Sequence, residues 1–258
     1  AYLDTYNLER ERGITIFSKQ AEFELGNRGI TLLDTPGHVD FSAEMERTLQ
    51  VLDYAILVIN GADGVQGHTM TLWRLLARYQ IPTFLFINKM DQDGTDKEKL
   101  LAELKKRLSD NCVDFTWEKS ALQSQFLEDV SVCDEDLLEK YLETEEISAS
   151  DIRKVIKERK LFPCFFGSAL KMTGVEEFLH GLEKYCETPT YPSEFGAKVF
   201  KIARDDQGNR LSYMKITGGN LKVKELLTDT EKADQIRIYS GAKFELAKEA
   251  PAGTICAV

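Results

Sequence analysis

The sequence predicts an α/β fold, a doubly wound sheet, followed by a small antiparallel β domain. Between Ala21 and Cys186, short apolar runs alternate with stretches of helical period. After the Pro-containing stretch Thr188–Ser193, the pattern changes to segments of period two that are separated by turn residues. Repeated strand and helix are typical of a doubly wound sheet, and period-two segments are typical of antiparallel strands.

Five runs are predicted as strands of the first domain, and the last four are apolar on both faces, as in a sheet covered by helices. They are Ala21–Leu25, Ile30–Asp34, Tyr54–Asn60, Thr83–Asn88 and Cys164–Ser168. The helices predicted between them are Phe41–Leu52, Thr69–Gln80, Lys97–Asp110 and Val175–Cys186. Ligands of such sheets bind beyond the carboxyl ends of the strands, so we expect the functional residues at that edge.

The stretch from 92 to 167 is long for a single crossover, and we interpret the residues around 111–160 as a helical insertion. Its acidic run Asp134–Tyr141 is predicted to be a solvated helix face.

The linker divides the chain into a first domain, 1–190, and a β domain, 195–258. Turn residues such as Gly218-Gly219-Asn220 separate the strands of the second domain, which we expect to be barrel-like. These strands are Lys198–Ala203, Leu211–Ile216, Gln235–Tyr239 and Thr254–Val258.

Composition favours a cytoplasmic protein that does not bind nucleic acid by bulk charge. Five scattered cysteines without C-x-x-C spacing indicate reduced thiols, and neither a disulfide framework nor a zinc site. No apolar run reaches membrane-spanning length, and the first residues do not read as a signal peptide. The net charge of −10 means that any RNA contact must come from a local patch or from another part of the protein.

The most informative motif is Asp34-Thr35-Pro36-Gly37-His38, which directly follows an apolar run. A carboxylate at a strand end can hold Mg²⁺ on nucleotide phosphates, and a glycine lets a backbone N–H approach the terminal phosphate. An ordinary turn after a strand is the alternative.

A second motif, Asn88-Lys89-Met90-Asp91, follows the apolar run Thr83–Ile87. The Asp91 carboxylate can accept hydrogen bonds from guanine N1–H and the 2-amino group, which adenine does not present in that arrangement. Asn88 would brace the loop, and the stem of Lys89 would lie over the base. A four-residue string often arises by chance, but its place at a strand end downstream of the first motif argues against chance.

Two further segments are weaker signals by themselves. Gly167-Ser168-Ala169-Leu170 follows a strand and could supply a backbone N–H to the guanine oxygen, or simply cap a helix through Ser168. The segment Glu9–Ile16 contains Thr15, whose hydroxyl can ligate Mg²⁺, beside Gly13, which permits a mobile loop; a charged solvated loop is the alternative.

These four segments resemble, in order, the second to fifth G motifs of translation GTPases, the class that includes elongation factor G and the ribosomal protection class of tetracycline resistance proteins. The segment from Gly196 resembles the β-barrel second domain of those factors. The resemblance implies a P-loop NTPase-type sheet, binding of GTP or GDP with Mg²⁺, and GTP hydrolysis on the ribosome, through rRNA and ribosomal proteins, by a monomeric full-length protein.

Roles for individual residues follow from the resemblance. Thr15 and Asp34 would hold Mg²⁺, the Gly37 N–H would contact the γ-phosphate, and His38 would orient the attacking water behind an apolar gate that includes Ile14. Guanine would be held by Asn88, Lys89, Asp91, Ser168, Ala169 and Leu170.

The resistance class is favoured because the stretch from Asp91 to Ser168 is short for the insertion of elongation factor G. Local likenesses at residues 88–94, 136–141 and 161–163 point the same way. The alternatives are elongation factor G or a paralogue acting in translocation, and a guanine-nucleotide binding module that does not hydrolyse GTP.

No G-x-x-x-x-G-K-[ST] phosphate loop occurs in the sequence. Its nearest counterpart, Gly61–Thr69, has the wrong spacing and a histidine in place of the lysine. The family places this loop and the first strand upstream of Ala1. A truncated piece, a longer chain with disordered first residues and a gene without the loop remain open alternatives. In each case we expect these 258 residues alone to bind GTP weakly and to hydrolyse it negligibly.

Overall fold

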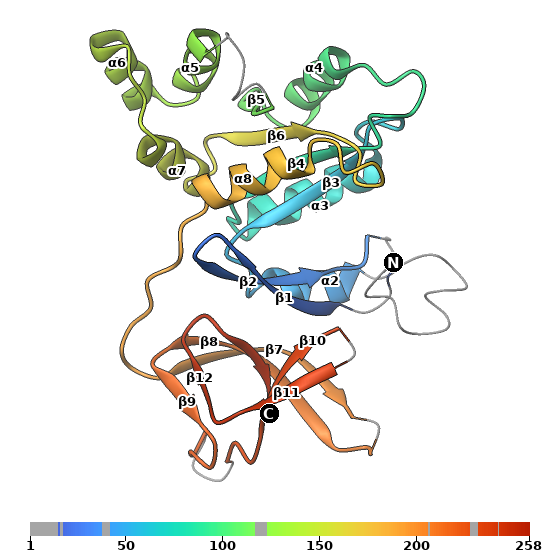
Figure 1. Ribbon diagram of the computed structural model, residues 1–258, viewed down its shortest axis with the longest axis vertical. Coiled ribbons are helices and arrows are strands. Elements are labelled where there is room, and N and C mark those ends of the chain that lie inside the picture. Colours follow the sequence, from blue (N-terminus) through green and yellow to red (C-terminus); the bar gives the residue numbers. More distant parts are fainter. Residues whose placement is uncertain are drawn as a thin grey trace. The chain divides into compact units, whose positions relative to one another are not determined.

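The computed structural model describes residues 15, 18–37, 42–116, 123–205, 207–227, 232–241 and 243–258. The chain divides into two compact units (Figure 1). One consists of Asp53–Glu187, and the other combines Ala1–Leu52 with Thr188–Val258. The domain bounds 1–190 and 195–258 stay a prediction.

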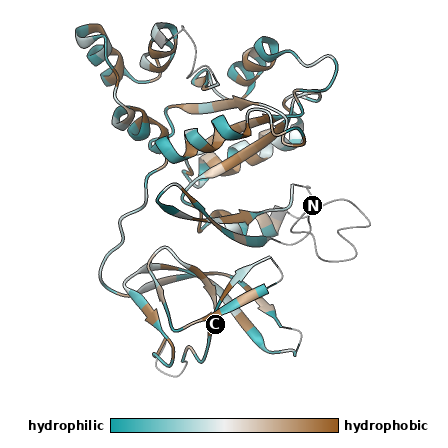
Figure 2. Cartoon of the chain, viewed as in Figure 1, coloured by the Kyte–Doolittle hydropathy of each residue, from teal (hydrophilic) through white to brown (hydrophobic). Residues whose placement is uncertain are grey.

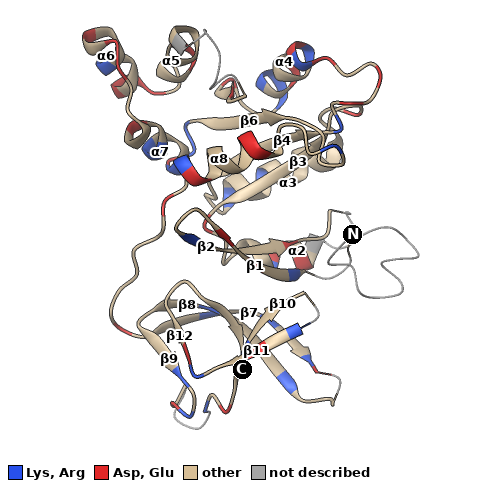
Figure 3. Cartoon of the chain, viewed as in Figure 1, with Lys and Arg blue, Asp and Glu red and all other residues tan. Residues whose placement is uncertain are grey.

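A parallel sheet forms the centre of the unit 53–187. Its strand order is β3-β4-β6-β5, with all neighbours parallel. The strands are β3 (Ala55–Asn60), β4 (Thr83–Asn88), β6 (Phe162–Phe166) and β5 (Cys112–Asp114). Strands β3, β4 and β6 contain no charged residue, and Figures 2 and 3 show them as an apolar, uncharged layer. Burial on both faces explains this composition for β4 and β6. Strand β3 is buried on one face only, since Ile56 and Val58 are exposed in the described part of the chain.

Helices pack on opposite faces of β6, which confirms the doubly wound fold. Residues three apart on a strand point to opposite faces. Phe162 packs against Trp73 of α3 (Gly67–Arg78), with ring centroids 4.6 Å apart. Phe165 packs against Phe178 of α8 (Val175–Tyr185), with centroids 5.3 Å apart. The third predicted helix of this unit is α4 (Lys97–Arg107), which Asp96 caps by accepting from the Lys99 N–H.

Outside residues 117–122, which the structure does not describe, the expected insertion contains three helices and one strand. The helices are α5 (Gln123–Ser131), α6 (Glu135–Thr144) and α7 (Ala149–Lys157). The acidic side of α6 is exposed while Leu137 is buried, as expected of a solvated helix face. Besides these helices, the helical insertion expected around 111–160 includes β5, which pairs in register with β6 and extends the sheet.

Among the described residues of the N-terminal part, 15, 18–37 and 42–52, the other unit has a hairpin and one helix. Strands β1 (Lys19–Leu25) and β2 (Arg28–Asp34) pair antiparallel, and Gly26 enters the turn with φ 58°. We had expected Ile30–Asp34 to be a strand of the parallel sheet, but β2 pairs with β1 because the two-residue turn reverses the chain directly. Helix α2 (Ser42–Leu49) follows.

The β domain is antiparallel, as predicted. A five-stranded sheet has the order β11-β10-β13-β8-β7, and β12 pairs with β9. The strands are β7 (Gly196–Arg204), β8 (Arg210–Gly218), β9 (Asn220–Lys222), β10 (Ile236–Ser240), β11 (Lys243–Ala247), β12 (Glu249–Pro251) and β13 (Ile255–Ala257). Its buried core includes Ile216, Leu221 and Ile236, each 0% exposed.

The packing of α8 on the sheet gives a test of the fold. A Cβ at Gly181 of α8 would overlap the Phe165 ring, which is 1% exposed and held among Phe115 and Phe178. Gly181→Ala in the complete protein should therefore lower the free energy of unfolding by about 1–3 kcal/mol despite the better helix propensity of alanine. Thermal unfolding followed by circular dichroism measures this.

The matched control is Gly67→Ala in the first turn of α3, where a Cβ has nothing within 4 Å. It should leave the unfolding midpoint unchanged or raise it. Equal stability of the two variants would contradict the packing of α8 described above.

Candidate functional site

The loops that follow β4 and β6 meet at the carboxyl edge of the sheet. Ile87 and Phe166 are register partners at the ends of these parallel strands. Beyond them, the Gly167 N–H donates to the Ile87 carbonyl at 2.9 Å, and the Met90 N–H donates to the Gly167 carbonyl at 3.0 Å. A Cβ at Gly167 would overlap the carbonyl oxygen of Thr173, so only glycine fits there. The strands therefore place residues 88–91 directly beside residues 167–170.

The side chain of Asn88 joins the two loops. Its Oδ1 accepts hydrogen bonds from the Lys89 N–H at 2.8 Å and from the Ala169 N–H at 2.9 Å. Lys89 has φ 64°, in the left-handed region, and this turn directs the chain from the strand into the loop. Asn88 is half-buried, whereas the side chain of Lys89 is exposed. The bracing role predicted for Asn88 agrees with this geometry.

The Asp91 carboxylate lies at the open side of these loops. A hydrogen bond with Ser168 is the largest cause that keeps the pKa of Asp91 below its usual value, and Lys171 adds to the effect. Lys171 Nζ lies 3.4 Å from Asp91 Oδ2. Ser168 is 2% exposed, while the Asp91 side chain is 24% exposed. Asp91 is therefore an ionised acceptor that solvent can reach, with its position fixed by a buried hydroxyl.

Lys171 was missed in the sequence because a lysine after Ser168-Ala169-Leu170 is unremarkable as a pattern. Its side chain is 62% exposed, and its backbone N–H donates to Ser168 Oγ at 3.4 Å. Leu170, next to it, is 91% exposed at the tip of the loop. A base that enters this site must replace the ammonium group at Asp91.

The arrangement suits a planar ligand with two adjacent N–H donors. Asp91 offers carboxylate oxygens, and the side chain of Lys89, two residues earlier in the loop, is exposed. The Ala169 N–H already donates to Asn88, so a ligand oxygen there would share that donor or use the next N–H, that of Leu170. Guanine has the matching donors at N1 and the 2-amino group, and an acceptor at O6.

The residues predicted to contact phosphate and Mg²⁺ belong to the other compact unit. Asp34 is the last residue of β2 and is half-buried, as is Thr15. Gly37 is exposed, and a Cβ there would have nothing within 4 Å. His38 and Ile14 lie outside the described residues. Carboxylate and hydroxyl oxygens, as in Asp34 and Thr15, are donors that suit Mg²⁺.

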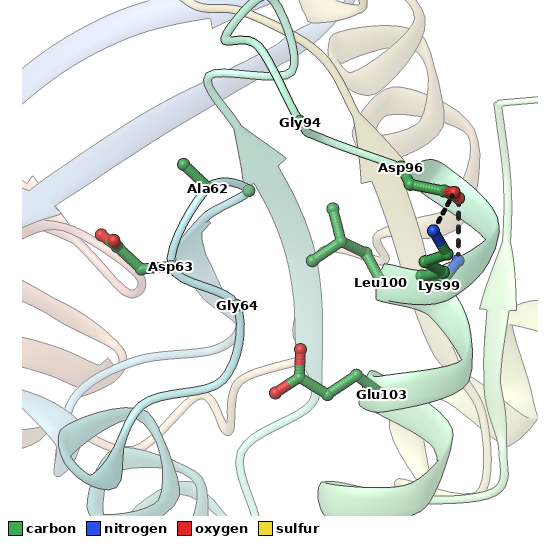
Figure 4. A pocket seen from close by; sticks show the side chains of 9 residues that line it. Ala62, Asp63, Gly64, Gly94, Asp96, Lys99, Leu100 and Glu103 are labelled. Atoms are coloured by element: carbon green, nitrogen blue, oxygen red, sulfur yellow. Dashed lines mark hydrogen bonds and ion pairs between the residues drawn. The ribbon is translucent and has the colours of Figure 1, made fainter.

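A pocket of about 210 Å³ lies between the turn after β3 and helix α4 (Figure 4). Its lining includes three acidic residues, Asp63, Asp96 and Glu103. Asp96 caps α4 and pairs with Lys99, and Glu103 accepts from the Val65 N–H and pairs with Arg107. A phosphate would be repelled by this lining, which agrees with the rejection of Gly61–Thr69 as a phosphate loop. The pocket contains none of the predicted guanine residues.

Comparisons with known proteins identify related sequences. The family model described as Elongation factor Tu GTP binding domain matches residues 1–188. Elongation factor G of Ureaplasma urealyticum serovar 10 is 30% identical over 329 residues, covering 100% of this chain and 48% of that protein. Tetracycline resistance protein TetM from transposon Tn5251 of Streptococcus pneumoniae is 36% identical over 267 residues, covering 95% of this chain and 41% of that protein.

A crystal structure of a protein from Thermus thermophilus has a similar fold, with a TM-score of 0.85 and 23% identity. The similarity covers 99% of this chain and 46% of that one. The chain thus spans about half the length of the relatives that it matches. In the described part of the chain, every helix is too short or too polar to span a bilayer.

The pairing of Lys171 with Asp91 predicts that Lys171 competes with a bound base. Lys171→Met in the complete protein should tighten GDP binding by a factor of up to about five at low ionic strength, since exposed ion pairs are weak. The gain should shrink in high salt, which screens the pair in the unsubstituted protein. Titration with a fluorescent GDP analogue measures both.

Lys106→Met is the control, because it removes the same charge from an exposed position on α4. Weaker GDP binding by Lys171→Met than by this control would mean that Lys171 supports the base instead of competing with it.

Proposed function

The chain belongs to the Elongation factor Tu GTP binding domain family, and from this premise we propose that it binds GTP and GDP at the edge formed by β4 and β6. The observation that carries the proposal is the joined pair of loops, in which Asn88 braces Ala169 and Ser168 holds the Asp91 carboxylate. Asp91 accepts from guanine N1–H and the 2-amino group. Lys89 covers the base with its stem, and the Ser168–Leu170 loop donates to O6.

Hydrolysis of GTP would use the residues of the other unit. Asp34 and Thr15 have the oxygen donors that Mg²⁺ prefers, and the bound ion would neutralise charge on the phosphate oxygens. The Gly37 N–H would contact the γ-phosphate. His38 would hold the attacking water in line with the γ-phosphorus. This role matters because phosphoryl transfer is catalysed mainly by positioning of the reacting groups.

We further propose that the complete protein acts in the cytoplasm on the ribosome, as a monomer, and gives tetracycline resistance by ribosomal protection. TetM of Streptococcus pneumoniae is more similar by identity, at 36%, than elongation factor G of Ureaplasma urealyticum, at 30%. The elongation factor G match extends over 329 residues, 71 more than the 258 of this chain, whereas the TetM match extends over 267. The greater length of the elongation factor G match indicates that this chain lacks the larger insertion of elongation factor G, which favours the resistance class.

Two alternatives have distinct signatures. Elongation factor G or a paralogue would promote translocation on ribosomes free of tetracycline, and its gene would not protect cells from the drug. A binding module without hydrolytic activity would bind GDP but show no turnover with ribosomes. Growth with and without tetracycline, together with ribosome-stimulated phosphate release, separates all three.

Nucleotide choice tests the proposed site. In the complete protein, Asp91→Asn should weaken GTP binding at least about a hundredfold. The amide has a single acceptor oxygen, so it cannot accept hydrogen bonds from both guanine donors, and a donor is left unpaired. The affinity for xanthosine triphosphate should rise, since its 2-oxo group can accept a hydrogen bond from the new amide. Competition binding measures both affinities.

Asp93→Asn is the matched control, since it makes the same change at an exposed aspartate two residues away. It should leave the GTP preference intact. An Asp91→Asn protein with the GTP preference of the control would rule out this site.

The absence of a phosphate-loop motif from these 258 residues leads to a second expectation. The purified polypeptide of these residues should bind GTP weakly and hydrolyse it negligibly, because the phosphates lack their usual cradle of backbone N–H groups and a lysine. Phosphate release at the rate of the complete protein, by a polypeptide of confirmed mass, would contradict this.

A further inference from the structure

Lys201 of β7 reaches from the β domain to the N-terminal part of the same compact unit. Its Nζ lies 2.8 Å from Oε1 of Glu44, with the two side chains only 17% and 14% exposed. The same ammonium group lies 3.4 Å from the Ser18 carbonyl oxygen and 5.8 Å from the centre of the Tyr213 ring. Partial burial strengthens this ion pair and reduces its screening by salt.

Glu44 connects three segments through one carboxylate. It lies in the first turn of α2, and its Oε1 also accepts from the Ser18 N–H at 3.4 Å. The Ser18 hydroxyl lies 3.0 Å from the hydroxyl of Thr48, which is 1% exposed on the same helix. The carboxylate therefore ties the segment at Ser18, helix α2 and strand β7 together.

A second lysine contacts the chain just after α2. Lys215 of β8 is 5% exposed, and its Nζ donates to the Val51 carbonyl at 3.0 Å. Val51 lies two residues beyond Leu49, the last residue of α2. Val51 also packs in a buried cluster with Phe200 and Ile255. The β domain thus contacts the first turn of α2 and the residue two positions after its end.

The two segments fixed in this way adjoin the predicted phosphate and metal residues. Ser18 comes three residues after Thr15, and α2 begins five residues after Gly37. We propose that Lys201 is a positioning residue for GTP hydrolysis, which acts through Glu44 on both segments and makes the β domain part of the hydrolytic apparatus. This inference rests on the proposed function, because it assigns a role in the same reaction.

The guanine residues belong to the other compact unit, so nucleotide affinity and turnover should respond differently to loss of Lys201. In the complete protein, Lys201→Met should lower ribosome-stimulated GTP turnover about 10- to 100-fold, the range expected from misplaced reacting groups. The affinity for GDP should change less than about twofold, since Asp91 supplies most of the base recognition. Lys201→Arg should restore most of the turnover.

Hydrogen exchange in α2 is a readout that does not depend on turnover. Lys201→Met and Glu44→Gln should both speed amide exchange in residues 42–49 when GDP is bound, because both remove the ion pair. Lys198→Met, an exposed position on the same strand, removes an equal charge and should change neither exchange nor turnover.

The outcomes separate this inference from the proposed function. Unchanged turnover and unchanged α2 exchange in folded Lys201→Met would overturn the positioning role, as would an equal effect of Lys198→Met. A parallel loss of GDP affinity and thermal stability would overturn it too, because the pair would then serve only folding. If the unsubstituted protein neither bound GDP nor hydrolysed GTP, the proposed function would fail, and this inference with it.

Discussion

The amide oxygen of Asn88 accepts hydrogen bonds from two backbone N–H groups on different loops, and the candidate base site depends on it. One donor is the next residue on its own loop, and the other is Ala169, 81 residues away. Without this acceptor, the N–H groups would be left without their protein partner at the edge of a tightly packed sheet. The positions of Asp91 and Ser168 follow from the junction, since each lies within three residues of one of its ends.

The parallel sheet makes this junction possible. β4 and β6 consist almost entirely of buried apolar residues, so their register is fixed by packing on both faces and not by the loops. The loops can then carry polar and exposed residues, including a left-handed Lys89, without loss of position. In the other unit, the β domain provides the corresponding support, because Lys201 contacts the first turn of α2 and Lys215 contacts Val51 just after it.

Much of this could be predicted from the sequence, because the parallel strands and main helices have strong periodicity. The three-residue strand β5 could not, since it is too short for a periodic signal and exists only through its pairing with β6. The Gly26-Asn27 turn is the sequence signal for the antiparallel pairing of β2, but the apolar residues Ile30, Leu32 and Leu33 also fit a strand of the parallel sheet. Contacts between residues distant in the chain, such as Lys171 with Asp91 or Lys201 with Glu44, leave no local pattern at all.

We propose that the edge formed by β4 and β6 recognises guanine through its N1–H and 2-amino donors. Calorimetric titration of the complete protein with GDP, inosine diphosphate and ADP tests it most directly. Inosine keeps N1–H and O6 but lacks the 2-amino group, so we expect GDP to bind at least about tenfold more tightly than inosine diphosphate. ADP, which lacks this donor arrangement, should bind more weakly still. Equal affinities for the three nucleotides would contradict the account.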